Sequence, residues 1–202
     1  MNYTHDYFII ESLKKKDIND GKIFNDALIS TNDYNPIYRK DKTRKGFEKA
    51  LIEYSKSEYK YLFISAHGDE ENVTLISYSF NAYDLEDLEI DLKNRRVFMS
   101  TCKGGSFLLA KYFIKKGALS VIGTPDNLTQ IVATGIWVTM ALVFERLSKG
   151  VLNFVELDKT LKIMTKVYEI KLSYFSFIRN KKNMKGYLYS ADNKRQRIDY
   201  PL

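Results

Sequence analysis

The chain has 202 residues, carries 32 Lys and Arg against 25 Asp and Glu for a formal net charge of +7, and is 45% hydrophobic. This length suits a single domain, residues 1–202, and the composition excludes a disordered or low-complexity protein. No signal peptide or membrane-spanning run is visible and the single cysteine cannot form an internal disulfide, so we expect a cytoplasmic protein without membrane association.

The first half of the chain predicts strands that alternate with helices. Apolar runs predict strands at residues 7–10 and 61–67, and the second run is continuous, as is typical of a strand buried on both faces. Helical spacing predicts helices at residues 23–28 and 47–54. The segment "NVTLISYSF" predicts a strand or hairpin, and a short helix follows with Asp84 as its N-cap.

The second half repeats the alternation. Residues 97–101 predict a buried strand that ends at Cys102, followed by a glycine turn and a helix with Gly117 as its C-cap. A buried strand at "ALSVIG", helices at residues 129–149 and 154–178, and a late strand at "GYLY" follow. This succession predicts a mostly parallel sheet covered by helices on both faces.

Two reactive side chains stand at matching places in this pattern. His67 and Cys102 each follow a predicted buried strand, where the carboxyl ends of parallel strands gather binding and catalytic groups. Neighbouring strands lie about 4.8 Å apart, so the two side chains can face one crevice. A thiolate is a nucleophile, Gly104 and Gly105 let a substrate approach the backbone, and His67 can protonate a leaving amine. The N–H groups of Gly68 and Cys102 can converge on an oxyanion. The alternative is that His67 and Cys102 are only structural.

The segments "FISAHGD", "VFMSTCKGGS" and "ALSVIGTPDN", in this order, resemble the caspase-like cysteine peptidases, and the CHAT and bacterial branches more than the animal caspases. The resemblance covers residues 61–127 and implies a three-layer α/β/α sandwich with a mostly parallel caspase-like sheet. It also implies a cysteine endopeptidase with Cys102 as nucleophile, His67 as general acid and base, and Gly68 as oxyanion-hole donor. No metal or organic cofactor is implied. The implied partners are a protein or peptide substrate and an activating protein, within a bacterial stress or antiphage response.

Two features bear on specificity. The animal-caspase pattern Gln-Ala-Cys-x-Gly is absent, so cleavage after aspartate is not expected. In the family resembled, the loop after the third strand lines the pocket for the residue before the cut, and here that loop contains Asp126. Asp126 and the acid-rich segment 68–92 favour a cationic residue at the cut. The alternative is that Asp126 caps the helix that begins near Thr129. From the long polar stretch 19–45 we also expect weak basal activity and activation by a partner.

Other functions fit less well or remain open. A thiol phosphatase needs an arginine six residues after its cysteine, where this chain has Leu108, and no P-loop motif is present. The open alternative is a catalytically silent caspase-like module that binds an acidic partner or nucleic acid through residues 159–197, which hold eleven Lys and Arg against two acids. The lysines at positions 159, 162, 166, 181, 182 and 185 are more typical of a solvated helix face and loop than of a binding surface.

Overall fold

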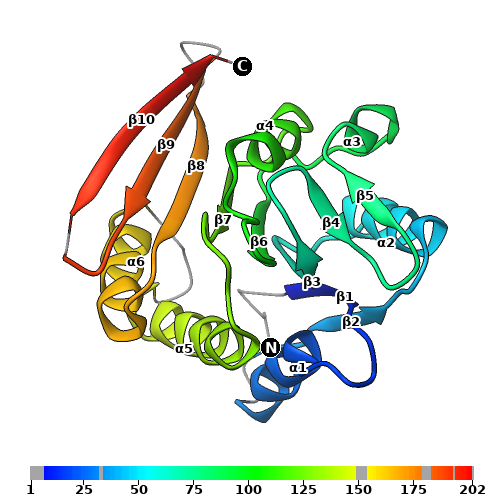
Figure 1. Cartoon of the computed structure of the whole chain (residues 1–202), viewed down its shortest axis with the longest axis horizontal. Coiled ribbons are helices and arrows are strands. Elements are labelled where there is room, and N and C mark those ends of the chain that lie inside the picture. The colour runs from blue at the N-terminus through cyan, green and yellow to red at the C-terminus, as the bar shows by residue number, and fades with distance from the viewer. Residues whose placement is uncertain (1–6, 32–33, 149–153, 179–182, 193, 202) are drawn as a thin grey trace.

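The computed structural model describes residues 7–31, 34–148, 154–178, 183–192 and 194–201, which form a mixed sheet with helices on both faces (Figure 1). The strands are β1 (Tyr7–Ser12), β2 (Ile37–Lys40), β3 (Tyr61–Gly68), β4 (Asn72–Thr74), β5 (Ser79–Asn81), β6 (Arg96–Ser100), β7 (Ser120–Gly123), β8 (Leu172–Ile178), β9 (Asn183–Tyr189) and β10 (Arg195–Pro201). The helices are α1 (Asp20–Ser30), α2 (Arg44–Lys56), α3 (Asp84–Asp87), α4 (Phe107–Lys115), α5 (Gln130–Ser148) and α6 (Phe154–Tyr168).

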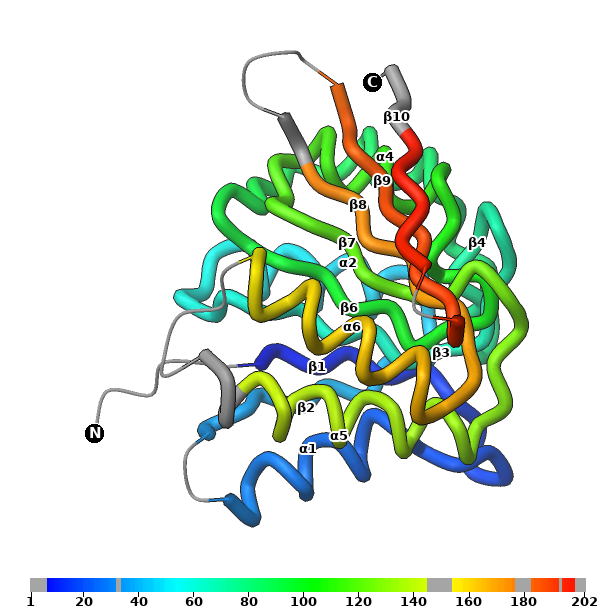
Figure 2. The backbone as a smooth tube through the Cα atoms, turned by 90° about the vertical axis from the view of Figure 1, so that its left-hand side faces the viewer, coloured from blue at the N-terminus to red at the C-terminus, as the bar shows by residue number. Residues whose placement is uncertain are grey.

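The strand order of the main sheet is β10-β9-β8-β7-β6-β3-β1-β2. Strands β2, β1, β3, β6 and β7 pair in parallel, and β8, β9 and β10 continue the sheet as antiparallel strands. Helices α1, α5 and α6 cover one face and α2, α3 and α4 the other (Figure 2). The predicted α/β/α sandwich is therefore confirmed, and its sheet is mixed: parallel from β2 to β7 and antiparallel from β7 to β10.

The central strands are buried on both faces. In β1, Phe8 and Ile10 pack in the core under α2 and α4, whereas Tyr7 and Ile9 pack in the core under α1 and α5. Full burial of such a side chain stabilises the fold by about 1.5–3 kcal/mol. Because successive strand residues point to opposite faces, a strand covered on both sides reads as a continuous apolar run. This is why β1, β3, β6 and β7 are predictable from the sequence.

The register of β3 and β6 sets the position of the two reactive residues. Ser65 of β3 pairs with Ser100 of β6 in a parallel ladder. His67 and Cys102 each lie two residues beyond that pair, so the chain brings them to the same edge of the sheet side by side.

One predicted helix is wrong in its second half. Helix α6 ends at Tyr168, and Glu169 has a φ of 53°, in the left-handed region that ends a helix. The following residues form β8, in which Phe175 faces the α4 side and Tyr174 the α6 side. An apolar and aromatic run of this length fits a helix or a strand, which explains the error. Strands β2 and β10 were also not predicted.

Several local predictions can be compared directly. The hairpin of β4 and β5 is confirmed, and the helix end at Gly117 is one residue off: the C-cap of α4 is Lys116, and Gly117 follows it with a φ of 97° and donates its N–H to Ile114 O at 2.9 Å. Asp84 is not the N-cap of α3 but its first residue, and its carboxylate accepts a hydrogen bond from Asn81 N at 2.8 Å. Within the described residues, no helix combines the length and apolar character needed to cross a bilayer.

Candidate active site

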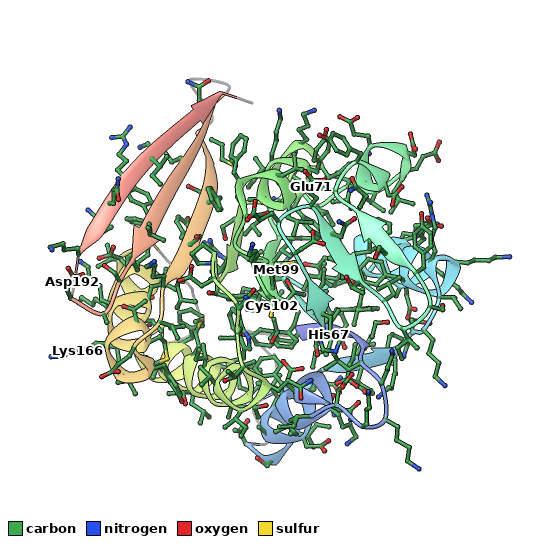
Figure 3. The ribbon with its side chains drawn as sticks, viewed as in Figure 1. His67, Glu71, Met99, Cys102, Lys166 and Asp192 are labelled. Atoms are coloured by element: carbon green, nitrogen blue, oxygen red, sulfur yellow. The ribbon has the colours of Figure 1, made fainter. Side chains whose placement is uncertain are left out.

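His67 and Cys102 line one small pocket at the carboxyl edge of the sheet (Figure 3). The pocket has a volume of about 30 Å³ and is otherwise lined by Leu13, Asp20, Ala66, Ser100, Thr101, Leu128, Gln130 and Ala133. These residues come from β3 and β6, from the segments that follow β1 and β7, and from the start of α5. The structure thus brings together the two residues that the sequence predicts as a reactive pair.

A strained turn presents the thiol. Lys103 has a φ of 54°, in the left-handed region that disfavours side chains with a Cβ. At Gly104 a Cβ atom would collide with Thr101 Oγ1, and the Gly104 N–H donates to Thr101 O at 3.1 Å. This turn separates Cys102 from α4, whose N-cap is Ser106. Cys102 therefore lies outside the first turn of α4, and the polar contacts of its sulfur come from Leu128 in the loop after β7.

The sulfur of Cys102 contacts the backbone of Leu128. The Leu128 N–H donates to Cys102 Sγ at 3.4 Å, and the thiol donates to Leu128 O at 3.5 Å. Among the described residues, His67 and Cys102 share the pocket without a hydrogen bond to each other.

The imidazole of His67 is held by a carboxylate that the sequence analysis did not single out. His67 Nε2 lies 3.1 Å from Asp17 Oδ2, and the Asp17 side chain is 12% exposed against 50% for His67. Partial burial acts to raise the pKa of Asp17, but the hydrogen bonds from His67 and from the Lys14 N–H outweigh it and lower that pKa. Since an ionised carboxylate only accepts, Nε2 carries the proton and Nδ1 remains available to a substrate.

A second carboxylate lies deeper in the pocket. Asp20 is the first residue of α1, is 5% exposed, and accepts hydrogen bonds from the hydroxyls of Ser65 and Ser100. Burial raises the pKa of Asp20, and repulsion by Glu11 adds to that effect, although the two serine hydroxyls act in the opposite direction. A buried carboxyl group beside a reactive pair is a common mark of a functional site.

Gly68 lies against the nucleophile turn. A Cβ atom at this position would come within 2.8 Å of Asn72 O, 3.1 Å of Thr101 Cβ and 3.3 Å of Cys102 O. Glycine therefore allows the backbone after His67 to approach the backbone around Cys102 closely. The same two segments are joined by the Lys103–Glu70 ion pair at 2.9 Å and by the Ser106 hydroxyl, which donates to Glu70 O at 2.6 Å.

Asp126 lies away from this pocket. Its side chain is 53% exposed and its nearest charged partner is Lys171 at 3.5 Å, while its backbone carbonyl accepts a hydrogen bond from Lys103 N at 3.0 Å. The carboxylate neither lines the pocket of Cys102 nor makes a capping bond to α5.

The sequence analysis missed Asp17 and Asp20 as site residues. Both stand in the segment that leaves β1, and β1 is the parallel neighbour of β3. Acidic residues directly after a buried strand are a usable signal, because the carboxyl ends of neighbouring parallel strands meet at one edge. No cluster of three or more metal-binding side chains occurs in the part of the chain that the structure describes.

The layers and the sheet order define the fold as that of the caspase-like α/β class. Among solved structures, the chain is similar to gingipain R, described as an Arg-specific cysteine proteinase, with a TM-score of 0.59 and 10% identity over 98% of this chain and 66% of that one. It is also similar to the complex of the pro- and mature domains of RgpB from Porphyromonas gingivalis, with a TM-score of 0.55 and 11% identity over 98% and 68% of the two chains.

Identities this low show the fold alone, and the chain spans just under two thirds of the length of the first gingipain structure. No protein-family model matches the chain, and a search of curated proteins finds no match. The likeness supports the caspase-like fold, whereas the CHAT or bacterial branch stays a prediction.

Proposed function

We propose that the protein is a cysteine endopeptidase in which Cys102 is the nucleophile and His67 the general acid and base. The observation that carries this proposal is that both side chains line one pocket at the ends of adjacent parallel strands. The cysteine proteinase neighbours, which have the same class of fold, support a thiol mechanism.

In the proposed reaction, Cys102 Sγ attacks the scissile carbonyl carbon after its proton passes to His67. The tetrahedral intermediate collapses to a thioester, and His67 gives its proton to the leaving amine through Nδ1, since Nε2 is held by Asp17. Water then loses a proton to His67 and attacks the thioester carbon, the C–S bond breaks to release the acid product, and the departing sulfur takes the proton back from His67. Asp17 acts as a positioning residue because it fixes the imidazole through Nε2.

The oxyanion would be bound by backbone N–H groups. The absence of a Cβ at Gly68 lets its backbone approach that of Cys102 closely, so the Gly68 and Cys102 amides would both lie near a carbonyl under attack by the thiol. Two such donors directed at developing negative charge would lower the barrier to attack by the thiolate.

For specificity, we propose a cationic side chain at the cleavage point, as the sequence analysis expects, but with Asp20 as the carboxylate that binds it. Asp20 lines the pocket and is buried, whereas Asp126 is exposed and lies outside the pocket lining. The Arg specificity of gingipain R supports a cationic preference in this class of fold. The role of Asp126 in substrate binding stays a prediction.

The biological setting is proposed on the family resemblance. Regulated, limited proteolysis in the cytoplasm within a bacterial stress or antiphage response fits the branch that the sequence resembles. The complex of a gingipain pro-domain with its mature domain supports control of this fold by a second polypeptide. An activating or inhibiting protein partner is therefore part of the proposal.

A second candidate function is binding without catalysis. Both polar contacts of the thiol go to the Leu128 backbone, as in a structural cysteine. Lys159 and Lys166 are exposed on α6 without ion pairs among the described residues, and Figure 3 shows Lys166 at the rim of the molecule. Lys162 is less available, because Asp158 neutralises it. A surface of this kind would suit an acidic protein or nucleic acid.

The proposal is tested by replacing the two reactive residues. We expect Cys102→Ala and His67→Ala each to reduce peptide cleavage by at least ~10³-fold, because one removes the nucleophile and the other its proton partner. A chloromethyl ketone probe with a basic side chain should label the parent at Cys102, and His67→Ala much more slowly. Circular dichroism and thermal unfolding control for the fold. Full proteolytic activity in either variant would exclude the dyad.

A further inference from the structure

A second and larger concavity lies on the other side of the nucleophile turn. It has a volume of about 300 Å³ and its apolar lining comes mainly from Phe107, Pro125, Phe175, Leu188 and Ile198. An apolar cavity of about 150 Å³ holds a benzene molecule, so this groove has room for a large aliphatic or aromatic side chain. The small pocket of Cys102 has about a tenth of this volume.

The groove exists because the sheet extends beyond the helix that covers it. Helix α4 packs against β7 and β8, while β9 and β10 continue the sheet further out (Figure 1). Phe175 on β8 forms part of the floor and is 5% exposed, and its ring lies against Gly186 of β9, where a Cβ atom would come within 2.8 Å of it. Ile198 on β10, partly exposed, forms the outer wall.

The groove is continuous with the loops that build the candidate active site. Gly105 and Ser106 line it and follow Cys102 by three and four residues. Consecutive Cα atoms are 3.8 Å apart, so the Cα atom of Gly105 lies within about 11 Å of that of Cys102. Pro125 also lines it and belongs to the loop whose Leu128 contacts the sulfur. A polypeptide bound at Cys102 in extended form reaches this distance in about three residues.

The groove lining has no unpaired charged side chain among the described residues, so we expect it to bind a neutral side chain. Glu70 is the one ionisable carboxylate of the lining, and Lys103 neutralises it at 2.9 Å. The remaining polar lining consists of serine hydroxyls and backbone, and the Ser106 hydroxyl is already bonded to Glu70 O. Such a surface favours burial of apolar area over binding of an ion.

We propose that this groove is an accessory substrate subsite, which binds a large apolar side chain of the polypeptide two to four residues away from the scissile bond. The inference rests on the proposed peptidase function and defines its substrates more narrowly: a cationic residue at the cut, with a leucine- or phenylalanine-like residue nearby.

The test uses Ile198→Glu, with Gln196→Glu as a matched control on the same strand outside the groove lining. Peptides carry Arg at the cut and either Leu or Gly at each flanking position. We expect the parent and Gln196→Glu to cleave the Leu peptide at least ~10-fold more efficiently than the Gly peptide at one flanking position, and Ile198→Glu to lose this preference. If Ile198→Glu fails to fold, Ile198→Thr replaces it, since it keeps the β-branched shape and adds a hydroxyl.

Binding is measured separately, by fluorescence polarisation of the labelled peptides on Cys102→Ala. The subsite is supported if Cys102→Ala binds the Leu peptide more tightly than the Gly peptide and the double variant with Ile198→Glu does not. This result would support the subsite even if the parent cleaves no peptide; in that case only the peptidase proposal fails. Cleavage and binding that are equal for Leu and Gly, or a Leu preference that survives Ile198→Glu, overturn the subsite and leave the peptidase proposal intact.

Discussion

At the scale of single residues, the candidate site depends on two carboxylates in contrasting surroundings. Asp17 is kept ionised by the hydrogen bonds from His67 and Lys14 N–H, which outweigh its partial burial and lower its pKa. Asp20 is buried, and its pKa is raised. An ionised carboxylate suits a group that orients an imidazole. A buried carboxyl group such as that of Asp20 suits a binding pocket, because a bound cationic side chain would favour loss of the proton from that carboxyl group.

Replacement of Asp17 should act on turnover rather than on substrate binding. We expect Asp17→Asn to lower kcat by at least ~10-fold with KM changed by less than ~2-fold, because the imidazole loses the charge that orients it. Asp26→Asn, which changes an exposed acid of α1, is the control. A fall in stability with an unchanged kcat would assign Asp17 a structural role only.

Replacement of Asp20 should change how stability depends on pH. Because the pKa of Asp20 is raised above 3.8 in the folded state, the unfolded chain releases this proton first as pH rises. The free energy of unfolding therefore falls as pH rises from about 3.8 to the folded-state pKa, and Asp20→Asn should remove this loss. Relative to the parent, the variant should gain stability as pH rises above about 4, measured by urea unfolding.

The control for Asp20 has the opposite sign. Lys22 lowers the pKa of Asp26 below 3.8, so Asp26→Asn should lose stability relative to the parent as pH rises toward about 3.8, below the range in which Asp20 titrates. Asp20→Asn should also abolish the preference for Arg at the cut. A stability difference that is independent of pH would contradict the buried, proton-holding state of Asp20.

At the scale of the elements, the nucleophile turn depends on a close crossing of two backbone segments. Gly105, after β6, and Gly123, at the end of β7, lie against each other, and Gly105 N–H donates to Thr124 O at 2.8 Å. A Cβ atom at Gly123 would lie 2.6 Å from Gly105 N, and one at Gly105 would lie 2.5 Å from Gly123 O. Backbone atoms cannot move aside as a side chain can, so both positions require glycine.

Alanine at this crossing should destabilise the protein and disturb the site together. We expect Gly123→Ala to lower the free energy of unfolding by about 1–3 kcal/mol through overpacking, and to reduce cleavage through displacement of the turn. In the control Gly46→Ala, the new Cβ meets the Asp41 carboxylate, a flexible side chain, and alanine favours α2 by about 1 kcal/mol over glycine. Urea unfolding measures both variants. Equal effects of the two substitutions would show that the crossing tolerates a methyl group.

At the scale of the whole molecule, the pocket at Cys102 is closed to a large side chain. Its volume of about 30 Å³ matches the space of a single water molecule, so an arginine cannot enter unless the loop between β7 and α5 moves. The stretch 19–45, from which the sequence analysis inferred latency, contains the ordered elements α1 and β2. The closed pocket is now the better reason to expect latency.

Latency is measurable as a dependence of thiol reactivity on reagent size. We expect the protein alone to cleave peptides weakly. The rate at which Cys102 reacts with each reagent is divided by the rate for free cysteine, and this relative rate should be at least ~10-fold higher for methyl methanethiosulfonate than for a bulky maleimide. An activating partner should reduce this difference. Robust turnover by the purified protein, or equal relative rates for both reagents, would contradict a closed resting state.

Much of the fold could be predicted from local sequence patterns, because a strand buried on both faces is a continuous apolar run and many turns require glycine. The strands that carry His67 and Cys102, the layers around them and the helix end near Gly117 were predictable in this way. The boundary between α6 and β8 was not, because the run after Tyr168 fits either structure and only pairing with β7 selects the strand.

The surroundings of the reactive pair were decided by tertiary structure. Strand β1 inserts next to β3, and this neighbour relation brings Asp17 to His67 across fifty residues of chain and Asp20 beneath Ser65 and Ser100. A sequence orders residues along one dimension, whereas sheet order depends on how helices and strands bury their apolar faces together. The sequence therefore predicted the pair from strand ends, and only the packed sheet selected the carboxylates that orient the imidazole and line the pocket.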